Sequence, residues 1–97
     1  MSRSYFVYLL ASRPHGTLYI GSTSDLIARV HQHKCAAFDS FTRQHGVDRL
    51  MWFEAHENAR AMVTRERQLK EWRRSWKVEL IEASNPGWKD LYPELLE

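Results

Sequence analysis

The sequence feature that most constrains the fold is an apolar run near the amino terminus, Tyr5–Ala11. Large aromatic and aliphatic side chains occupy both alternating sets of positions in this run. A strand of this kind has both faces covered, because a strand with one face in water alternates between apolar and polar residues. Residues 12–16 contain proline and glycine and predict a turn, and residues 17–21 predict the partner strand of a hairpin. The chain must therefore place structure on both sides of a sheet.

The rest of the chain supplies that cover mainly as helices. The remaining predicted elements, in chain order, are a helix from residues 22–25 to residue 34 or 35, a short helix over 38–45, a third strand over 50–54, helices over 58–70 and 72–83, and a closing segment over 88–96. Hydroxyl side chains followed by a carboxylate mark the first helix start, while Gly46 and Pro86 mark later helix ends. This order predicts an α+β fold, a three-stranded antiparallel sheet flanked by helices.

The size and composition indicate one globular domain. A chain of 97 residues suffices for one domain and is too short for two, so we expect residues 1–97 to form a single domain. Cys35 is the only cysteine, which excludes an intramolecular disulfide and a cysteine metal cluster and favours a reducing compartment. No run approaches the roughly 20 apolar residues of a membrane helix. We therefore expect a soluble protein of the cytoplasm, and we assume that it is a monomer.

A basic stretch lies between residues 60 and 77, although the formal net charge of the chain is only +2. Seven arginines and lysines fall in it against two glutamates, and Trp72 and Trp76 are interleaved with them. Cationic and aromatic side chains in this pattern predict a face that binds nucleic-acid phosphates. An ordinary solvated helix surface is the alternative. The candidate contacts are Arg65, Lys70, Arg73, Arg74 and Lys77.

Two tyrosines and an arginine–histidine pair are the next candidates for chemistry. Folding the hairpin back on itself brings Tyr8 and Tyr19 opposite or nearly opposite each other, so that the two phenols can share one site. Arg29 and His33 are one helical turn apart and project from the same face, at the edge of the core, where an arginine can bind a phosphate. The alternatives are a stabilising aromatic pair in the sheet and a surface arginine beside a structurally satisfied histidine.

Glu66 is the third candidate. It falls inside the apolar stripe of its predicted helix, one turn after Met62, and burying a carboxylate is costly unless a charge or a metal satisfies it. A single hard carboxylate that leaves water ligands in place is a common way to hold Mg²⁺. An ion pair with Arg73 or Arg29 is the structural alternative. Two phenols, an arginine, a histidine and a carboxylate together suit phosphodiester hydrolysis.

These residues resemble the signature of the GIY-YIG nuclease family. The segments that carry the resemblance are Phe6-Val7-Tyr8, Tyr19-Ile20-Gly21, Ser22-Thr23-x-Asp25-Leu26, Arg29, His33, Arg65-Glu66-x-x-Leu69-Lys70-x-Trp72-Arg73-Arg74, Leu80-Ile81 and Asn85-Pro86-x-Trp88-x-Asp90-Leu91. They span nearly the whole chain and are most similar to the small stand-alone bacterial members, which have a three-stranded sheet with flanking helices. Phe6 and Val7 stand where the first motif has glycine and isoleucine, so only its tyrosine remains.

The resemblance implies a metal-dependent endonuclease that hydrolyses DNA phosphodiester bonds, in DNA repair or processing, and leaves a 5′-phosphate and a 3′-hydroxyl. Its cofactor would be Mg²⁺ or Mn²⁺, and its substrates include branched or damaged DNA, with RNA left open. Carried over by position, the family's catalytic residues are Tyr8, Tyr19, Arg29, His33 and Asn85, and its metal ligand is Glu66. One of the tyrosines is then the general base, Arg29 stabilises the transition state, His33 assists, and Asn85 completes the site. Since a free tyrosine has a pKa of about 10, a base role needs help from the metal or from Arg29.

Two other classes of function compete with the nuclease. One is a catalytically weak or inactive nucleic-acid-binding module of the same fold, and the other is a structural adaptor that uses its tryptophans. For Asn85, an ordinary helix stop explains its position before a proline equally well.

Overall fold

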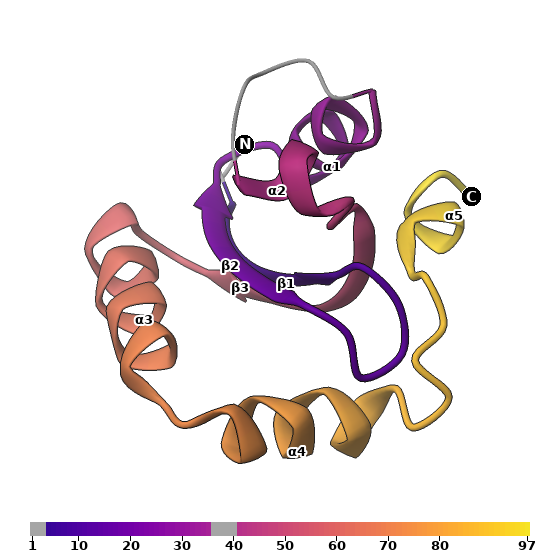
Figure 1. Ribbon diagram of the computed structural model, residues 1–97. Helices are drawn as coiled ribbons and strands as arrows, with labels where there is room; N and C mark the ends of the chain where they lie inside the picture. Colours follow the sequence, from indigo (N-terminus) through magenta and orange to yellow (C-terminus); the bar gives the residue numbers. More distant parts are fainter. Residues whose placement is uncertain (1–3, 36–40) are drawn as a thin grey trace.

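A central strand with one neighbour on each side forms the middle layer of the protein. The computed structural model describes residues 4–35 and 41–97 (Figure 1). Its elements, in chain order, are β1 (Tyr5–Ala11), β2 (Leu18–Thr23), α1 (Leu26–Lys34), α2 (Phe41–His45), β3 (Arg49–His56), α3 (Ala59–Glu71), α4 (Arg74–Ser84) and α5 (Tyr92–Leu95). The sheet is antiparallel with the strand order β2-β1-β3, which confirms the predicted fold class. The apolar run Tyr5–Ala11 is therefore the central strand, β1.

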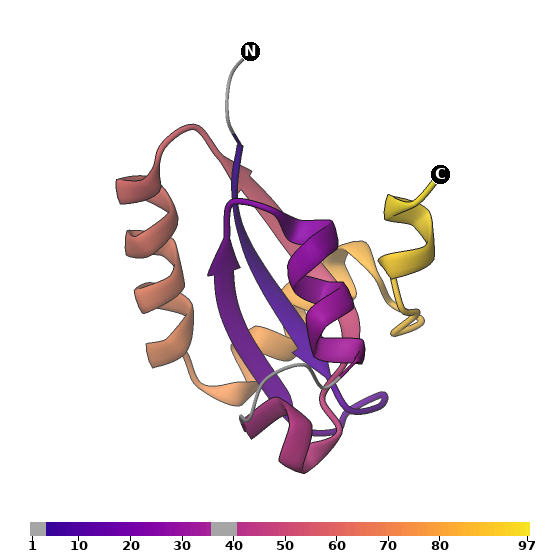
Figure 2. The same cartoon turned by 90° about the horizontal axis from the view of Figure 1, so that it is seen from above.

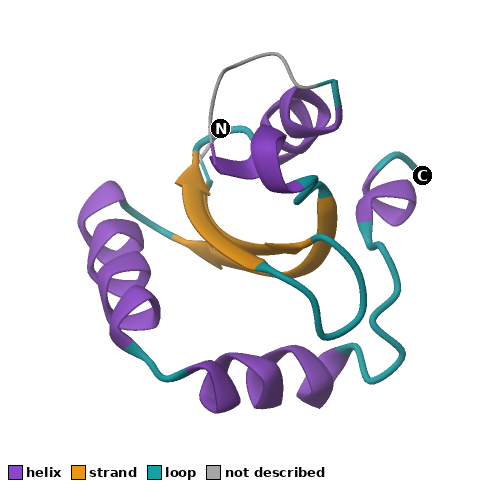
Figure 3. Ribbon diagram, in the orientation of Figure 1, coloured by secondary structure: helices purple, strands orange, loops and turns teal. Residues whose placement is uncertain are grey.

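The side chains of β1 alternate between two hydrophobic cores. Val7 and Leu9 pack with residues of α3 and α4, such as Leu69. Tyr8 and Leu10 belong to the second core, which includes residues of α1 and the segment around α5. Figures 1 and 3 show the sheet between these two groups of helices, and Figure 2 shows the same layers from above. A strand apolar on both faces is needed because helices cover both faces.

Local capping sets the helix boundaries. Asp25 caps α1, its side chain accepting a hydrogen bond of 3.1 Å from the backbone N–H of Ala28, and Asn58 caps α3 in the same way. The last predicted helix begins two residues later than expected, because Trp72 and Arg73 have extended backbone and separate α3 from α4. β3 is longer at both ends than predicted, and the predicted residues 38–40 of the short helix lie outside the described part of the chain.

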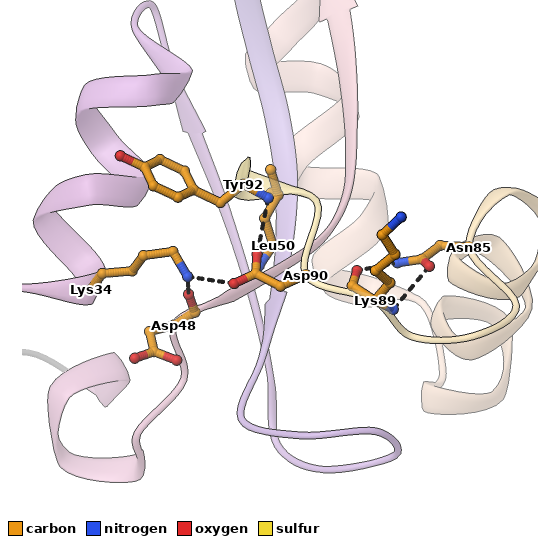
Figure 4. A network of polar contacts seen from close by, with 7 residues as sticks. All are labelled: Lys34, Asp48, Leu50, Asn85, Lys89, Asp90 and Tyr92. Carbon is orange, nitrogen blue, oxygen red and sulfur yellow. Dashed lines mark hydrogen bonds and ion pairs between the residues drawn. The ribbon is translucent and has the colours of Figure 1, made fainter. Parts of the chain in front are cut away.

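The carboxyl-terminal segment is fastened to α1 and β3 by Asp90 (Figure 4). One Asp90 oxygen accepts a hydrogen bond of 2.6 Å from Lys34 Nζ, and the other accepts bonds of 3.0 Å from the backbone N–H groups of Leu50 and Tyr92. Lys34 also donates to the carbonyl of Asp48. Burial alone would raise the pKa of Asp90, but these hydrogen bonds outweigh burial and hold the pKa below its usual range. Because Lys34 ends α1, the clasp helps to fix the helix that carries Arg29 and His33.

Within residues 4–35 and 41–97, no helix is long and apolar enough to cross a membrane.

Candidate active site

The two predicted tyrosines lie on the same face of the hairpin as diagonal neighbours. Tyr8 pairs directly with Gly21, and Tyr19 pairs with Leu10. The two ring centroids are 6.5 Å apart. The two tyrosines are therefore nearly opposite each other rather than directly opposite. Tyr8 is buried, with 2% of its surface exposed, whereas Tyr19 is half-buried.

Gly21 makes room for the phenol of Tyr8. A Cβ atom added at Gly21 would lie 2.5 Å from the Tyr8 hydroxyl oxygen, 2.6 Å from its Cζ and 3.1 Å from Cε2 of Tyr19. Real Cβ atoms essentially never approach other heavy atoms within 3.0 Å. The Tyr19-Ile20-Gly21 triplet thus supplies one tyrosine of the pair, Tyr19, and the glycine over which the other tyrosine, Tyr8, packs.

A buried chain of polar side chains starts at Tyr8. Its hydroxyl is 3.1 Å from His33 Nε2, and His33 Nδ1 is 3.0 Å from Thr42 Oγ1. His33 is 5% exposed and Thr42 is 3% exposed, so both contacts are shielded from water. The chain joins β1, α1 and α2, and it confirms that His33 lies beside the tyrosines. Thr42 was not predicted from the sequence, because it has no spacing relationship to the motif residues.

The electrostatic environment keeps this chain uncharged at neutral pH. Burial raises the pKa of Tyr8, and the proximity of Tyr19 and Glu66 raises it further, while Arg29 lowers it. Burial also lowers the pKa of His33, and Arg29 adds to that effect against an opposing contribution from Asp48. The phenol therefore holds its proton beside a neutral imidazole. When Nδ1 of His33 carries the ring proton and donates it to Thr42, Nε2 accepts the proton of Tyr8.

Arg29 supplies positive charge to the same cluster. It lies on α1 one turn before His33, and its side chain is half-buried. Its charge acts on the pKa values of both Tyr8 and His33, which places the guanidinium within electrostatic range of the two groups. The predicted position at the edge of the core is confirmed by this half-burial.

Glu66 lies on α3, behind the outer strand β2. One of its carboxylate oxygens accepts a hydrogen bond of 2.6 Å from Ser22 Oγ, and the other is 2.8 Å from Lys70 Nζ. Neither of the partners weighed from the sequence, Arg73 or Arg29, makes these contacts. Burial would raise the pKa of Glu66, but the bonds from Lys70 and Ser22 outweigh it and lower the pKa, so the carboxylate is ionised.

The surroundings of Glu66 suit a divalent ion held by one carboxylate. Its side chain is 18% exposed, and Lys70, which is 54% exposed, can move aside at little cost. In the described part of the chain, no three histidine, cysteine, aspartate or glutamate side chains converge on one point. A hard cation here would take its other ligands from water and from a phosphate, an arrangement that Mg²⁺ readily adopts.

β2 links this carboxylate to the tyrosines. Successive side chains of a strand point to opposite faces, so Ser22 faces α3 while its neighbour Gly21 faces Tyr8. Since β2 is an outer strand of the sheet, a phosphodiester lying along its edge can approach both faces. The influence of Glu66 on the pKa of Tyr8 is consistent with this proximity.

Asn85 is occupied by contacts at the end of α4 (Figure 4). Its Nδ2 donates to the carbonyls of Met51 and Lys89 at 3.2 and 2.8 Å, and its Oδ1 accepts from the backbone N–H of Lys89 at 3.0 Å. It is 6% exposed, and its own N–H caps the helix by bonding to Ile81. These contacts favour the alternative of a helix stop, and a catalytic role stays a prediction.

The five predicted nucleic-acid contacts divide into structural and accessible residues. Arg65 forms an ion pair of 3.0 Å with Glu54, and Arg74 donates to two carbonyls of the β1–β2 turn. Lys77 is half-buried, and its pKa is lowered by burial and by Arg74.

The other two contacts are exposed. Lys70 pairs with Glu66, and Arg73 lies 4.8 Å from the ring centroid of Trp76. Of the five predicted contacts, Arg73 and Lys70 are thus the two with the easiest access to a phosphate.

Comparisons with known proteins found a matching family model, related sequences and a similar fold. A sequence model of the GIY-YIG catalytic domain matches residues 4–79, a range that includes every residue of the cluster and ends before Asn85. The chain is 32% identical over 80 residues to a UPF0213 protein of Clostridium perfringens, covering 82% of this chain and 85% of that protein. It is 29% identical over 82 residues to a UPF0213 protein of Haloquadratum walsbyi, covering 84% and 91%. The solution NMR structure of a UPF0213 protein from Bacillus halodurans has the same fold, with a TM-score of 0.56 at 24% identity over 90% of this chain and 92% of that one.

Proposed function

Because the chain belongs to the family of GIY-YIG catalytic domains, we propose that it is an endonuclease that hydrolyses DNA phosphodiester bonds with the help of Mg²⁺ or Mn²⁺. The observation that carries the proposal is the buried Tyr8–His33 contact over Gly21, with Tyr19 and Arg29 beside it. We further propose that residues 1–97 act as one domain and that the protein works as a cytoplasmic monomer in DNA repair or processing.

The burial of the two tyrosines suggests different tasks for them. Tyr19 is half-buried and is the phenol with access to a substrate, so we assign it the contact with the attacking water. Tyr8 is buried against His33 and holds the imidazole in place. Tyr19 first releases its phenolic proton to solvent; as the water oxygen bonds to phosphorus, the proton of the water then passes to the phenolate oxygen of Tyr19.

Arg29 and Glu66 act on the charge of the phosphate. The guanidinium of Arg29 stabilises the additional negative charge of the transition state. Glu66 would hold the divalent ion, which when bound supplies further neutralisation of the phosphate oxygens. The bond from phosphorus to the 3′ oxygen breaks, and the leaving oxygen takes a proton from solvent.

The proposal is tested by cleavage of plasmid, single-stranded and branched DNA with Mn²⁺ and with EDTA. Arg29→Lys keeps the charge but loses the planar fork of donors, so cleavage should fall on the order of a hundredfold. Arg49→Lys, which changes an exposed arginine at the start of β3 and outside the basic stretch, is the matched control and should cleave normally. Normal cleavage by Arg29→Lys would remove the arginine from the mechanism.

The second candidate function is nucleic-acid binding without turnover. The exposed Arg73 and Lys70 favour it as much as they favour a nuclease. Metal-independent, salt-sensitive DNA binding with no cleavage of any of the three substrates would support this candidate and exclude the endonuclease.

A further inference from the structure

An exposed aromatic side chain stands beside the proposed water-contacting tyrosine. Phe41, the first residue of α2, is 46% exposed. Its ring is 6.5 Å from that of Tyr19 with an interplanar angle of 24°, a stacked arrangement. The ring of His45, one turn later in α2, lies 4.3 Å from the Phe41 ring and is tilted by 39°. Tyr19 is in turn 5.6 Å from His33, so a row of rings leads from the buried chain to the surface.

The orientation of α2 is fixed by its second residue. Thr42 points inward and contacts His33, with 3% of its surface exposed. The outward position of its neighbour Phe41 follows from that anchor. A large apolar ring in water next to a candidate active site offers a surface on which a planar ligand can stack.

We propose that Phe41, supported by His45, is a stacking platform for a single unpaired nucleobase adjacent to the scissile phosphate. The proposal rests on the proposed function and narrows its substrate class to DNA that presents an unstacked base at the cleavage point, such as a single strand, a flap or a branch. A base inside a regular duplex is stacked on both of its neighbours, so it reaches Phe41 only if it leaves the stack. Aromatic side chains bind unstacked bases of any sequence.

Two other exposed aromatic residues are poorer candidates. Trp76 is 45% exposed, and its ring contacts are with Trp72 and the guanidinium of Arg73 rather than with the tyrosines of the candidate site. Phe53 is 37% exposed, and its ring meets Phe6 edge-on at an angle of 67°. Phe41 differs from both because it stacks against a tyrosine of the cluster.

The test is the binding of two oligonucleotides of equal length, one single-stranded and one duplex, each with 2-aminopurine at a central position, measured in EDTA to prevent cleavage. Phe41→Ala should bind the single strand about 5- to 150-fold more weakly, because stacking on one aromatic side chain contributes about 1–3 kcal/mol per base. Duplex binding should change little. Phe41→Trp should restore both the affinity and the fluorescence quenching of the base.

Phe53→Ala is the matched control, since it removes an exposed phenylalanine from another part of the surface and should leave both affinities unchanged. Equal affinity of Phe41→Ala and the unaltered protein for the single strand would overturn the platform, as would an equal loss for both oligonucleotides. This failure is distinct from failure of the proposed function. If the protein prefers the single strand in a Phe41-dependent way but cleaves no substrate, the platform is supported and the nuclease is refuted. If Phe41→Ala cleaves single strand and duplex in the same ratio as the unaltered protein, the nuclease is supported and the platform is refuted.

Discussion

Replacement of Gly21 by alanine tests the packing at the centre of the candidate site. The added methyl group would meet the hydroxyl and Cζ of Tyr8 at 2.5 and 2.6 Å, so one of the two residues must move. Tyr8 is 2% exposed and cannot swing into solvent. Overpacking of this kind costs about 1–3 kcal/mol, and the smaller backbone entropy loss of alanine offsets about 0.5–1 kcal/mol. We expect a net loss in the free energy of unfolding of between about 0 and 2.5 kcal/mol.

The effect of Gly21→Ala on activity should exceed its effect on stability. A displacement of the phenol by about 1 Å breaks the 3.1 Å contact with His33, and misplacement on that scale costs on the order of a hundredfold in rate. Thermal unfolding followed by circular dichroism and Mn²⁺-dependent cleavage measured well below the midpoint separate the two effects. For a domain of this size the midpoint falls by about 4–8 °C for each kcal/mol.

Gly87→Ala is the matched control, because a Cβ at Gly87 meets no atom within 4 Å. Its melting temperature should stay the same or rise slightly, and its cleavage rate should not change. The reasoning is refuted if Gly21→Ala melts and cleaves like the unaltered protein, since Tyr8 then does not occupy the space over Gly21.

Three further substitutions test the surrounding contacts. Glu66→Gln should lose Mn²⁺ affinity, measured by calorimetry. The midpoint of thermal unfolding should change little, because the ion pair with the exposed Lys70 contributes only about 0.2–1 kcal/mol. A large loss of stability with unchanged Mn²⁺ affinity would refute the assignment of Glu66 as a metal ligand. Asp90→Asn should destabilise the protein at pH 7, as measured by urea unfolding, and the loss should shrink progressively as the pH falls below about 3.9, the unfolded pKa, because the lowered pKa of folded Asp90 stabilises the protein only while the carboxylate is ionised; an equal loss at every pH would contradict the ionic clasp. Asn85→Ala should lower the free energy of unfolding by about 1–3 kcal/mol, since it leaves buried backbone groups without partners. Its cleavage rate, measured below the midpoint of thermal unfolding, should not change; a lower rate would support a catalytic role for Asn85.

The hairpin and its tyrosines could be predicted because their geometry is encoded locally. Alternation along β1 and a short turn fix the register of the two strands, and the register places Tyr8 and Tyr19 on one face. The placement of Arg29 and His33 on one face of α1 is also encoded locally, since it follows from helical periodicity. The fold class followed from the same patterns.

Contacts between distant segments could not be predicted in this way. Arg73 or Arg29 was predicted as the partner of Glu66. The residues that bind it are Lys70, one turn away, and Ser22, which lies 44 positions earlier in the chain. Thr42 was missed for the same reason, because only the tertiary fold brings it to His33. Charge patterning also gave no sign that Arg65 and Arg74 are engaged within the fold.

The departures from the family motif at Phe6 and Val7 concern packing. The ring of Phe6 meets Phe53 edge-on at 6.4 Å, on the side of β1 that faces away from β2. Val7 is fully buried in the opposite core. Neither side chain takes part in the contacts among Tyr8, Gly21 and His33, so both positions can accept apolar residues that fit their cores. Gly21 cannot, because its missing side chain is the space that Tyr8 fills. The glycine of the second triplet is therefore a structural requirement for the tyrosine of the first, whereas the residue at position 6 has only to pack against the second core and the ring of Phe53.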